Sequence, residues 1–181
     1  LDGAKKGKVY TEALNLREGG ALKVWYKDNP NLFFVNQLER IENVPLQVVY
    51  ASSQEPREGD AAHLTDGETS TIWHTMYSVT LAKYPHWVDF DATSVKNMKG
   101  FIYTPRMDSY NGYVKDYEIY VSQDGKEWGE PVMKGSFEVT GEAHKVMFEK
   151  PVKARYIRFR ALSEQRGNDY ASGAEFGLIA E

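Results

Sequence analysis

Two short segments combine residues whose types and spacing could bind a hard cation. The first, residues 66–75, reads DGETSTIWHT, and the second, residues 171–176, reads ASGAEF. The first offers a carboxylate, a turn glycine and hydroxyls ahead of a tryptophan that can anchor the loop in a core, and the second adds another carboxylate. Calcium takes oxygen ligands of these kinds. The pair therefore predicts a metal that ties the first loop to a returning last strand, against the plainer reading that Asp66 belongs to an ordinary Asp-Gly turn and Glu175 is a solvated acid.

Strands are the elements that must position these segments. Apolar and polar residues alternate with period two over residues 87–90, 116–121 and 156–161, and no stretch sustains a helical period. Residues 60–64 are expected to form one helical turn before the Asp66 turn. The pattern predicts an all-β protein, an antiparallel β-sandwich in which one face of each strand is buried.

The first 43 residues are expected to form a separate hairpin or linker. Residues 8–16 and 21–26 read as two strands around a Gly-Gly turn. Residues 32–35 are expected to lead into the main domain, which we place at residues 44–181. An isolated hairpin is only marginally stable, so residues 1–43 are predicted to pack on the main domain or to be the remnant of another module.

Composition excludes several classes of partner and chemistry. The 181 residues carry 22 basic and 26 acidic side chains, a net charge of -4 with the signs interspersed, which argues against a nucleic-acid or anionic-membrane partner. Absence of cysteine excludes disulfides, thiolate metal sites and thiol catalysis. No apolar run is long enough for a transmembrane helix. The sequence begins at Leu1, so we expect a piece of a longer protein.

Six blocks in order resemble discoidin-like domains, also called coagulation factor type C domains, which overlap with the family 32 carbohydrate-binding modules. Besides the two segments above, the blocks are YPHWVDF at 84–90, GFIYTPR at 100–106, KDYEIYVS at 115–122 and ARYIRF at 154–159. The resemblance spans residues 44–181 and implies a jelly-roll sandwich with a galactose-binding-domain-like fold. Residues 1–43 are similar to the tail of the fibronectin-like modules that often precede such domains.

The resemblance also implies a role. Such modules are usually non-catalytic appendages of large secreted glycosidases, so we expect a monomeric module that binds a glycan and accompanies a catalytic domain of the same polypeptide, of chitobiase or hexosaminidase type. The implied location is secreted, periplasmic or at the cell surface. Galactose, N-acetylgalactosamine and N-acetylglucosamine remain open as ligands.

A structural Ca²⁺ is the cofactor that the resemblance implies. Carried onto matching positions, its ligands would be the backbone carbonyls of His63, Glu68 and Ala174, the side chains of Asp66 and Glu175, and both oxygens of Thr71.

The sugar-binding residues that the resemblance implies are His74, Arg106, Asn111 and Tyr170, with Tyr77 and Tyr110 as further rings. Each has a plainer reading. Arg106 could pair with nearby Asp108, Asn111 could only shape the turn before Gly112, and Tyr110 could cap the edge of the core. His74 follows Trp73, so alternation predicts that Trp73 points inward and His74 outward, where His74 could hydrogen-bond a ligand; its plainer reading is a satisfied structural histidine.

Two other functions compete with sugar binding. A glycosidase would need two suitably spaced carboxylates, and Asp89, Asp91, Asp108 and Asp116 are available, but none stands in a motif with a distinctive partner. A protein-interaction, adhesion or spacer module is the other alternative, because fold does not fix function.

Overall fold

The computed structural model describes residues 20–26, 29–38 and 44–181. The chain divides into two compact units, Leu1–Glu42 and Asn43–Glu181. No helix in the described ranges is long and apolar enough to cross a membrane.

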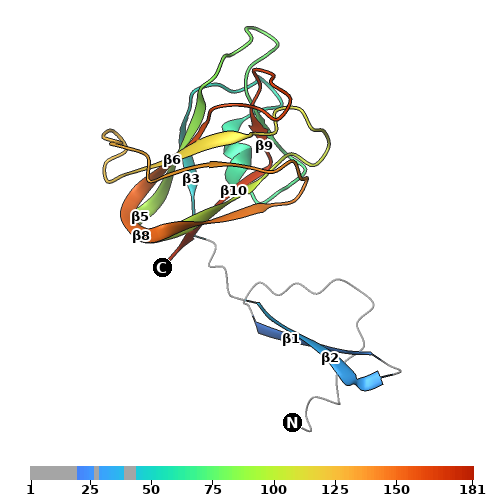
Figure 1. Cartoon of the computed structure of the whole chain (residues 1–181). Coiled ribbons are helices and arrows are strands. Elements are labelled where there is room, and N and C mark those ends of the chain that lie inside the picture. Colours follow the sequence, from blue (N-terminus) through green and yellow to red (C-terminus); the bar gives the residue numbers. More distant parts are fainter. Residues whose placement is uncertain (1–19, 27–28, 39–43) are drawn as a thin grey trace. The chain divides into compact units, whose positions relative to one another are not determined.

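The described part of the first unit is an antiparallel pair of strands, β1 (Gly20–Tyr26) and β2 (Asn29–Leu38) (Figure 1). The strand predicted at residues 21–26 is confirmed within β1. Residues 32–35, however, lie in β2 and pair with β1, so the expectation that they lead into the main domain was wrong. Pairing with the neighbouring strand closes only a short loop, which costs little entropy. The predicted strand at residues 8–16 lies outside the described residues.

The second unit is a β-sandwich built almost entirely of antiparallel strands (Figure 1). Its elements are β3 (Gln47–Ala51), the short 3₁₀ helix η2 (Ala61–Thr65), β4 (Trp73–His74), β5 (His86–Thr104), β6 (Asp116–Ser122), β7 (Met133–Ser136), β8 (His144–Ala161), β9 (Ser172–Gly173) and β10 (Glu175–Ala180). The sheet runs in the order β10-β5-β8-β6-β7, with β3 also paired to β5, while β4 and β9 form a separate pair. The predicted all-β fold and the helical turn near residue 61 are both confirmed.

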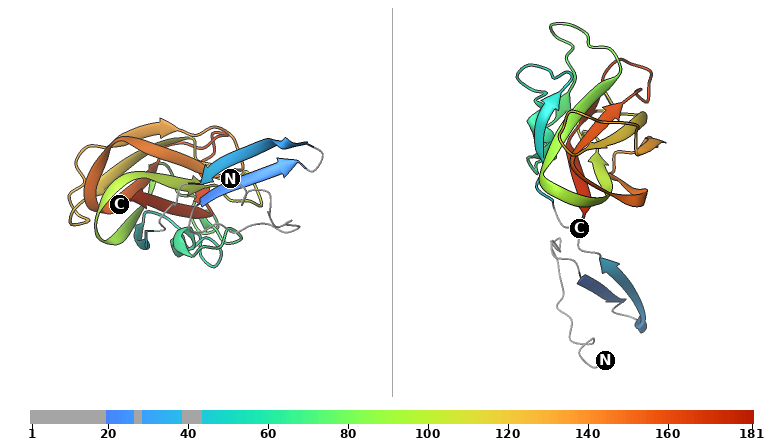
Figure 2. Two further views of the ribbon diagram at one scale, coloured as in Figure 1. Left: turned by 90° about the horizontal axis from the view of Figure 1, so that it is seen from below. Right: turned by 90° about the vertical axis from the view of Figure 1, so that its left-hand side faces the viewer.

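Two long strands, β5 and β8, pass through both layers of the sandwich, and Figure 2 shows them curving from two sides. The first half of β5 pairs with β3 and the second half with β10. Between them the β5–β8 register breaks, from Asp91 to Lys96, where Thr93 has a positive φ of 63°. The Asp91 carboxylate holds this bend by accepting from the Thr93 N–H and from Arg155. Such an irregularity lets a strand bend out of one layer into the other.

Aromatic side chains from both layers meet in the core. The rings of Phe90 in the first half of β5 and Phe176 in β10 stack at 4.5 Å between centroids, and Phe101 stacks on Phe176 at 5.5 Å. Trp73 is fully buried and its Nε1 donates to the Ser53 carbonyl at 3.0 Å. Burial of this many rings supplies most of the driving force for folding, and it leaves the loops at the ends free to carry function.

The acids considered above for a glycosidase are tied to structural partners. Arg158 binds the buried Asp89 carboxylate with two hydrogen bonds of 2.6 and 2.8 Å, and Arg155 binds Asp91 in the same way at 2.8 and 2.7 Å. Asp116 accepts from the Ser163 hydroxyl at 2.5 Å. Paired carboxylates of this kind stabilise a sheet surface, and their partners oppose a role as free acid and nucleophile.

Candidate functional site

The candidate site lies at one end of the sandwich, where loops from three parts of the chain converge. Strand β4 pairs with β9, so that His74 lies opposite Ser172. On its other side Ser172 forms a bridge with Tyr113, which brings the 105–112 loop beside β9. Loops 75–85 and 162–171, green and red in Figure 1, project from this same end.

His74 lies at the base of the site with its ring fixed. It is 5% exposed, and its Nδ1 donates to the Thr75 carbonyl at 2.7 Å. Burial lowers the pKa of His74 below its ordinary value, and the charge of Arg106 acts in the same direction. The ring is therefore neutral near pH 7, with Nε2 as a hydrogen-bond acceptor.

The prediction that only Trp73 of this pair would be buried was wrong, because both side chains are buried. Two tyrosines cover the imidazole: the ring of Tyr77 lies 5.1 Å and that of Tyr170 5.5 Å from it, centroid to centroid, and the two tyrosine rings are 6.3 Å apart. Tyr77 is 43% exposed. The two tyrosine rings form one aromatic wall over the buried imidazole, and Tyr77 is its more exposed member.

Arg106 enters the site from the end of β5. Its Nε and Nη2 donate to the two oxygens of the Asp108 carboxylate at 2.8 and 2.7 Å. The expected ion pair with Asp108 therefore exists, but among residues 44–181 the Nη1 group of Arg106 makes no hydrogen bond. A guanidinium oriented by one carboxylate keeps its remaining donors in a fixed direction, so this pairing prepares Arg106 for a ligand.

The 105–112 loop, which carries Arg106, is held in place by hydrogen bonds to its backbone carbonyls. The Ser172 hydroxyl donates to the Asn111 carbonyl at 2.7 Å, and the Tyr113 hydroxyl donates to the Arg106 carbonyl at 2.8 Å. Gly112 has a φ of 79°, and a Cβ there would lie 2.7 Å from Ser172 Oγ, so only glycine fits. Asn111 therefore shapes the turn through its backbone and keeps its side-chain amide available, while Tyr110 stands apart from the aromatic wall.

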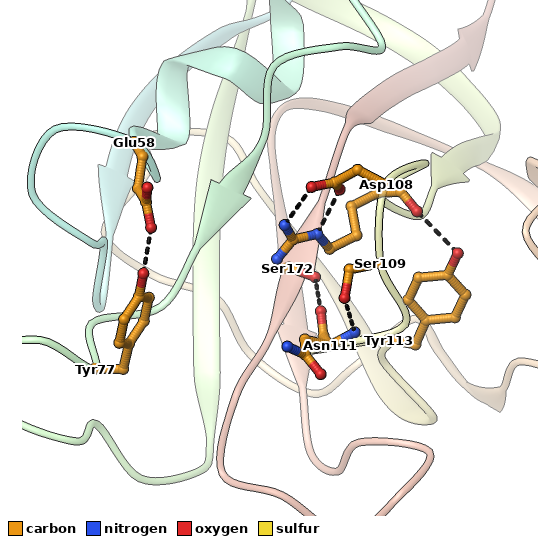
Figure 3. A network of polar contacts seen from close by, with 8 residues as sticks. Glu58, Tyr77, Asp108, Ser109, Asn111, Tyr113 and Ser172 are labelled. Atoms are coloured by element: carbon orange, nitrogen blue, oxygen red, sulfur yellow. Dashed lines mark hydrogen bonds and ion pairs between the residues drawn. The ribbon is translucent and has the colours of Figure 1, made fainter.

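Two glutamates that the sequence analysis missed hold the loop of Tyr77. The Tyr77 hydroxyl donates to Glu58, and Figure 3 shows this pair across from Asp108, Ser109 and Asn111. Glu55 is 3% exposed and accepts from the backbone N–H groups of Tyr77 and Ser78 at 2.7 and 3.0 Å. Its own N–H donates to the His74 carbonyl at 2.7 Å. Glu55 thus joins the base of the site to the loop of Tyr77.

A third glutamate, also missed, holds the loop of Tyr170. Glu164 is 3% exposed, and its Oε2 accepts from the N–H groups of Arg166 at 2.7 Å and Asn168 at 3.0 Å. The Tyr84 hydroxyl donates to the Tyr170 carbonyl, and His86 Nε2 donates to the preceding carbonyl of residue 169 at 2.7 Å. The loop that presents Tyr170 is therefore ordered before any ligand arrives.

The 66–71 loop, which is predicted to bind a metal, lies beside the last strand, β10. Thr71 Oγ1 lies 2.8 Å from both Asp66 Oδ2 and the Glu68 carbonyl, and the Glu68 N–H donates to Asp66 Oδ1 at 2.8 Å. Glu175, at the start of β10, lies against Asp66. The predicted return of the last strand beside the first loop is thus confirmed.

Among residues 44–181, no cationic side chain forms an ion pair with the carboxylates of Asp66 and Glu175. Burial and the neighbouring Asp66 carboxylate raise the pKa of Glu175 to about 7, and its Oε1 is buried without a hydrogen-bond partner. His63 Nδ1 donates to the Ile72 carbonyl at 2.8 Å, which fixes the direction of the ring. No three His, Cys, Asp or Glu side chains gather as a metal site in the described residues. The donors at hand, two carboxylates with a hydroxyl and carbonyls, nevertheless suit calcium.

The fold defines an antiparallel β-sandwich domain. The chain belongs to the F5/8 type C domain family, whose model matches residues 48–176. The resemblance stated from the sequence is confirmed.

Curated relatives are much longer proteins. The chain is similar to a sialidase of Micromonospora viridifaciens, with 36% identity over 151 residues that cover 81% of this chain and 23% of the sialidase. It is also similar to a galactose oxidase of Gibberella zeae, with 36% identity over 117 residues, 63% of this chain and 17% of the oxidase. The chain thus spans less than a quarter of the length of these relatives.

Solved structures agree with the family assignment. A family 32 carbohydrate-binding module of Clostridium perfringens in complex with GalNAc-β-1,3-galactose superimposes with a TM-score of 0.70 at 28% identity, covering 77% of this chain and all of that one. The family 32 module of NanJ from Clostridium perfringens, in complex with galactose, gives a TM-score of 0.67 at 26% identity, with 75% and 96% coverage. The C-terminal domain of a Bacteroides fragilis chitobiase shares the fold at 22% identity and a TM-score of 0.68, with 77% and 95% coverage.

Proposed function

We propose that this domain is a non-catalytic carbohydrate-binding module whose site reads a galactose, N-acetylgalactosamine or N-acetylglucosamine residue. One observation carries the proposal: the neutral imidazole of His74 lies against the rings of Tyr77 and Tyr170, and the Arg106 guanidinium, held by Asp108, is near enough to lower the pKa of His74. A pyranose presents an apolar face and a rim of hydroxyls, so it needs a ring to stack on and a few fixed donors and acceptors.

The donors and acceptors complement each other. His74 Nε2 accepts a hydrogen bond from a hydroxyl, Arg106 donates to hydroxyl oxygens, and the Asn111 amide can do both. Because Glu55, Asp108 and Glu164 hold these groups in place, little conformational entropy is lost on binding. A shallow site of this kind still buries little area, and affinity in the millimolar to micromolar range is expected.

Calcium serves a structural role in this proposal. Asp66 and Glu175 with the Thr71 hydroxyl and the carbonyls of His63, Glu68, Thr71 and Ala174 would hold the ion. The unpartnered Oε1 of Glu175 beside Asp66 is the support for it. A bound cation supplies the positive charge that two adjacent carboxylates need.

The wider setting is proposed from the relatives. Since the chain covers under a quarter of a sialidase and of a galactose oxidase, we infer that it accompanies a catalytic domain in a longer, secreted or cell-surface polypeptide and keeps it near its glycan. The module would act as a monomer.

Titration of the domain with galactose, N-acetylgalactosamine, N-acetylglucosamine and chitobiose, followed by amide chemical shifts in the presence of calcium, tests the proposal. We expect saturable shifts around His74, Arg106 and Tyr170 with at least one of these sugars. Tyr170→Ala should lower the affinity at least about tenfold, because a stacking ring is lost.

The matched control is Tyr50→Ala on strand β3, where the tyrosine is 52% exposed, and it should bind as the wild type does. No shift with any sugar would refute sugar binding and favour a protein-interaction or spacer role. Equal affinity of Tyr170→Ala and the wild type would move the site away from the aromatic wall.

A further inference from the structure

The two loops that meet at the proposed sugar site meet a second time. Loop 105–112 contributes Arg106 to the site, and loop 164–170 contributes Tyr170. Four residues along each loop, at Tyr110 and at Arg166, the loops touch again: the Arg166 guanidinium carbon lies 5.4 Å from the centroid of the Tyr110 ring. Along each loop the second contact is therefore at most about 14 Å of chain away from the first site.

The two side chains in this second contact, Tyr110 and Arg166, are exposed and are of types that can bind sugars. Tyr110 is 54% exposed although its ring also packs against Tyr113 at 5.2 Å. Arg166 is exposed, and among residues 44–181 its guanidinium forms no ion pair. The exposed part of the Tyr110 ring offers a stacking surface, and the guanidinium that lies over the ring adds hydrogen-bond donors beside it.

The backbone on both sides of this contact is fixed. The Arg166 N–H donates to the buried Glu164 carboxylate at 2.7 Å, and the Asn111 N–H, next to Tyr110, donates to Ser109 Oγ at 3.2 Å. On the far side of Asn111, Ser172 N–H donates to the Gly112 carbonyl at 2.8 Å. The two side chains therefore project from ordered loops, as the residues of the first site do.

We propose that Tyr110 and Arg166 form a second subsite, which binds the next sugar residue of a glycan whose terminal residue lies against His74, Arg106 and Tyr170. This inference rests on the proposed function and names its ligand class as disaccharides or longer glycans. The second sugar packs its apolar face on the open part of the Tyr110 ring and accepts hydrogen bonds from Arg166.

The test compares two affinities in the same protein by calorimetry or chemical-shift titration. The probes are GalNAc-β-1,3-galactose and its two component monosaccharides, with calcium present. The wild type should bind the disaccharide at least about fivefold more tightly than the better monosaccharide, and Tyr110→Ala should bring this ratio to about one, as expected for loss of one stacking partner. Arg166→Ala should lower the ratio about threefold.

Met107→Ala is the matched control, because Met107 is 62% exposed on the same loop and has no ring to stack; it should keep the wild-type ratio. A wild type that binds monosaccharides and the disaccharide equally, or variants that keep the ratio, would overturn the second subsite while leaving the first intact. Binding of none of the three sugars would overturn the second subsite, and absence of binding to N-acetylglucosamine and chitobiose as well would overturn the first.

Discussion

At the scale of single residues, the direction of hydrogen bonding at His74 follows from its surroundings. Because Nδ1 donates to the Thr75 carbonyl, the neutral ring carries its proton there and presents Nε2 as an acceptor. Burial, and then the Arg106 charge, lower the pKa of His74, while the Thr75 carbonyl and the carboxylates of Glu55 and Glu58 act in the opposite direction. The acceptor form therefore prevails at neutral pH.

Sugar binding should consequently fail in acid. The folded-state pKa of His74 lies below the ordinary value of 6.5, so the neutral form and full affinity persist above that pH. As pH falls through the lowered pKa, Nε2 becomes a donor, the acceptor for the sugar hydroxyl is lost, and affinity should drop at least about tenfold, the size expected when a buried hydrogen bond is broken. Titrations of the wild type from pH 7.5 to 4.5 measure this.

His74→Gln provides the control, because an amide keeps an acceptor but does not titrate in this range. It should bind more weakly than the wild type, and its affinity should be flat where the wild type falls. The neighbouring His86 also has a pKa lowered by burial, and it remains in both proteins. A wild-type affinity that stays constant while the imidazole chemical shifts of His74 show its protonation, with the domain still folded, would contradict the role given to Nε2.

At the scale of elements, loops present all the proposed ligand-binding groups except His74, which lies in the short strand β4, and buried glutamates order two of these loops. Glu164 acts on Tyr170 only through the backbone of its loop, so it is a positioning residue. Glu164→Ala should lower sugar affinity about three- to tenfold, because the ligand must then order the loop, and should cost about 1–3 kcal/mol of stability.

The variant Glu164→Gln distinguishes the positioning role of Glu164 from a general loss of stability. Glu164→Gln keeps an acceptor for the N–H groups of Arg166 and Asn168 and should recover most of the affinity. Amide hydrogen exchange should quicken at residues 165–170 in Glu164→Ala and stay slow in the core. Glu149→Ala, an exposed glutamate on β8, should change neither. Unchanged exchange in that loop with Glu164→Ala would contradict the positioning role.

The strands could be predicted from the sequence, whereas these loop contacts could not. Alternation at residues 156–161 correctly gave the inward side of β8, because period two reports directly on burial. The same rule failed at Trp73 and His74, where a two-residue strand is covered on both faces. It also missed Glu55 and Glu164, since a carboxylate that binds backbone N–H groups leaves no side-chain pattern. For Glu164 the available signal was the short spacing from the acid to a glycine-bearing loop, as in side-chain-to-backbone turns, whereas Glu55 binds N–H groups 22 and 23 residues away and leaves no local signal.

Some of the predicted site residues come together in the structure, and one does not. His74, Tyr77 and Tyr170 do come together, with Arg106 oriented beside them, because the six resembling blocks place these loops at one end of the sandwich. Tyr110 was grouped with them, yet it lies with Arg166 at the second meeting of the loops. Contacts between loops depend on their exact lengths and turns, and no residue pattern along one loop records them.

At the scale of the whole molecule, the stability of the sandwich depends on how its first loop is joined to its last strand. Strand β4 pairs with β9, and just before β4 the 66–71 loop faces Glu175 at the start of β10. The chain contains no cysteine, so no covalent bond closes this seam. In the proposed calcium site, one ion neutralises Asp66 and Glu175 and joins the two ends of the domain.

Removal of calcium should therefore lower the melting temperature of the entire domain. At a free calcium concentration of 100 times Kd, binding to the folded state alone adds about 2.7 kcal/mol, which corresponds to a rise of about 5–10 °C for a domain of this size. Calorimetric melts in excess chelator and in calcium measure the difference. Magnesium should restore little of it, since Mg²⁺ demands a smaller octahedral site and keeps its waters.

The variant Glu175→Gln tests whether the proposed site causes the calcium-dependent rise in melting temperature. Loss of one of the two carboxylates should abolish most of the calcium-dependent rise, and the melt in chelator should be no lower than that of the wild type, because the repulsion from Asp66 disappears together with the ligand. Glu142→Gln, in an exposed turn, removes the same charge elsewhere and should keep the full response. Identical wild-type melts in chelator and in excess calcium would show that the two carboxylates are accommodated without a metal, by sharing a proton at the raised pKa of Glu175.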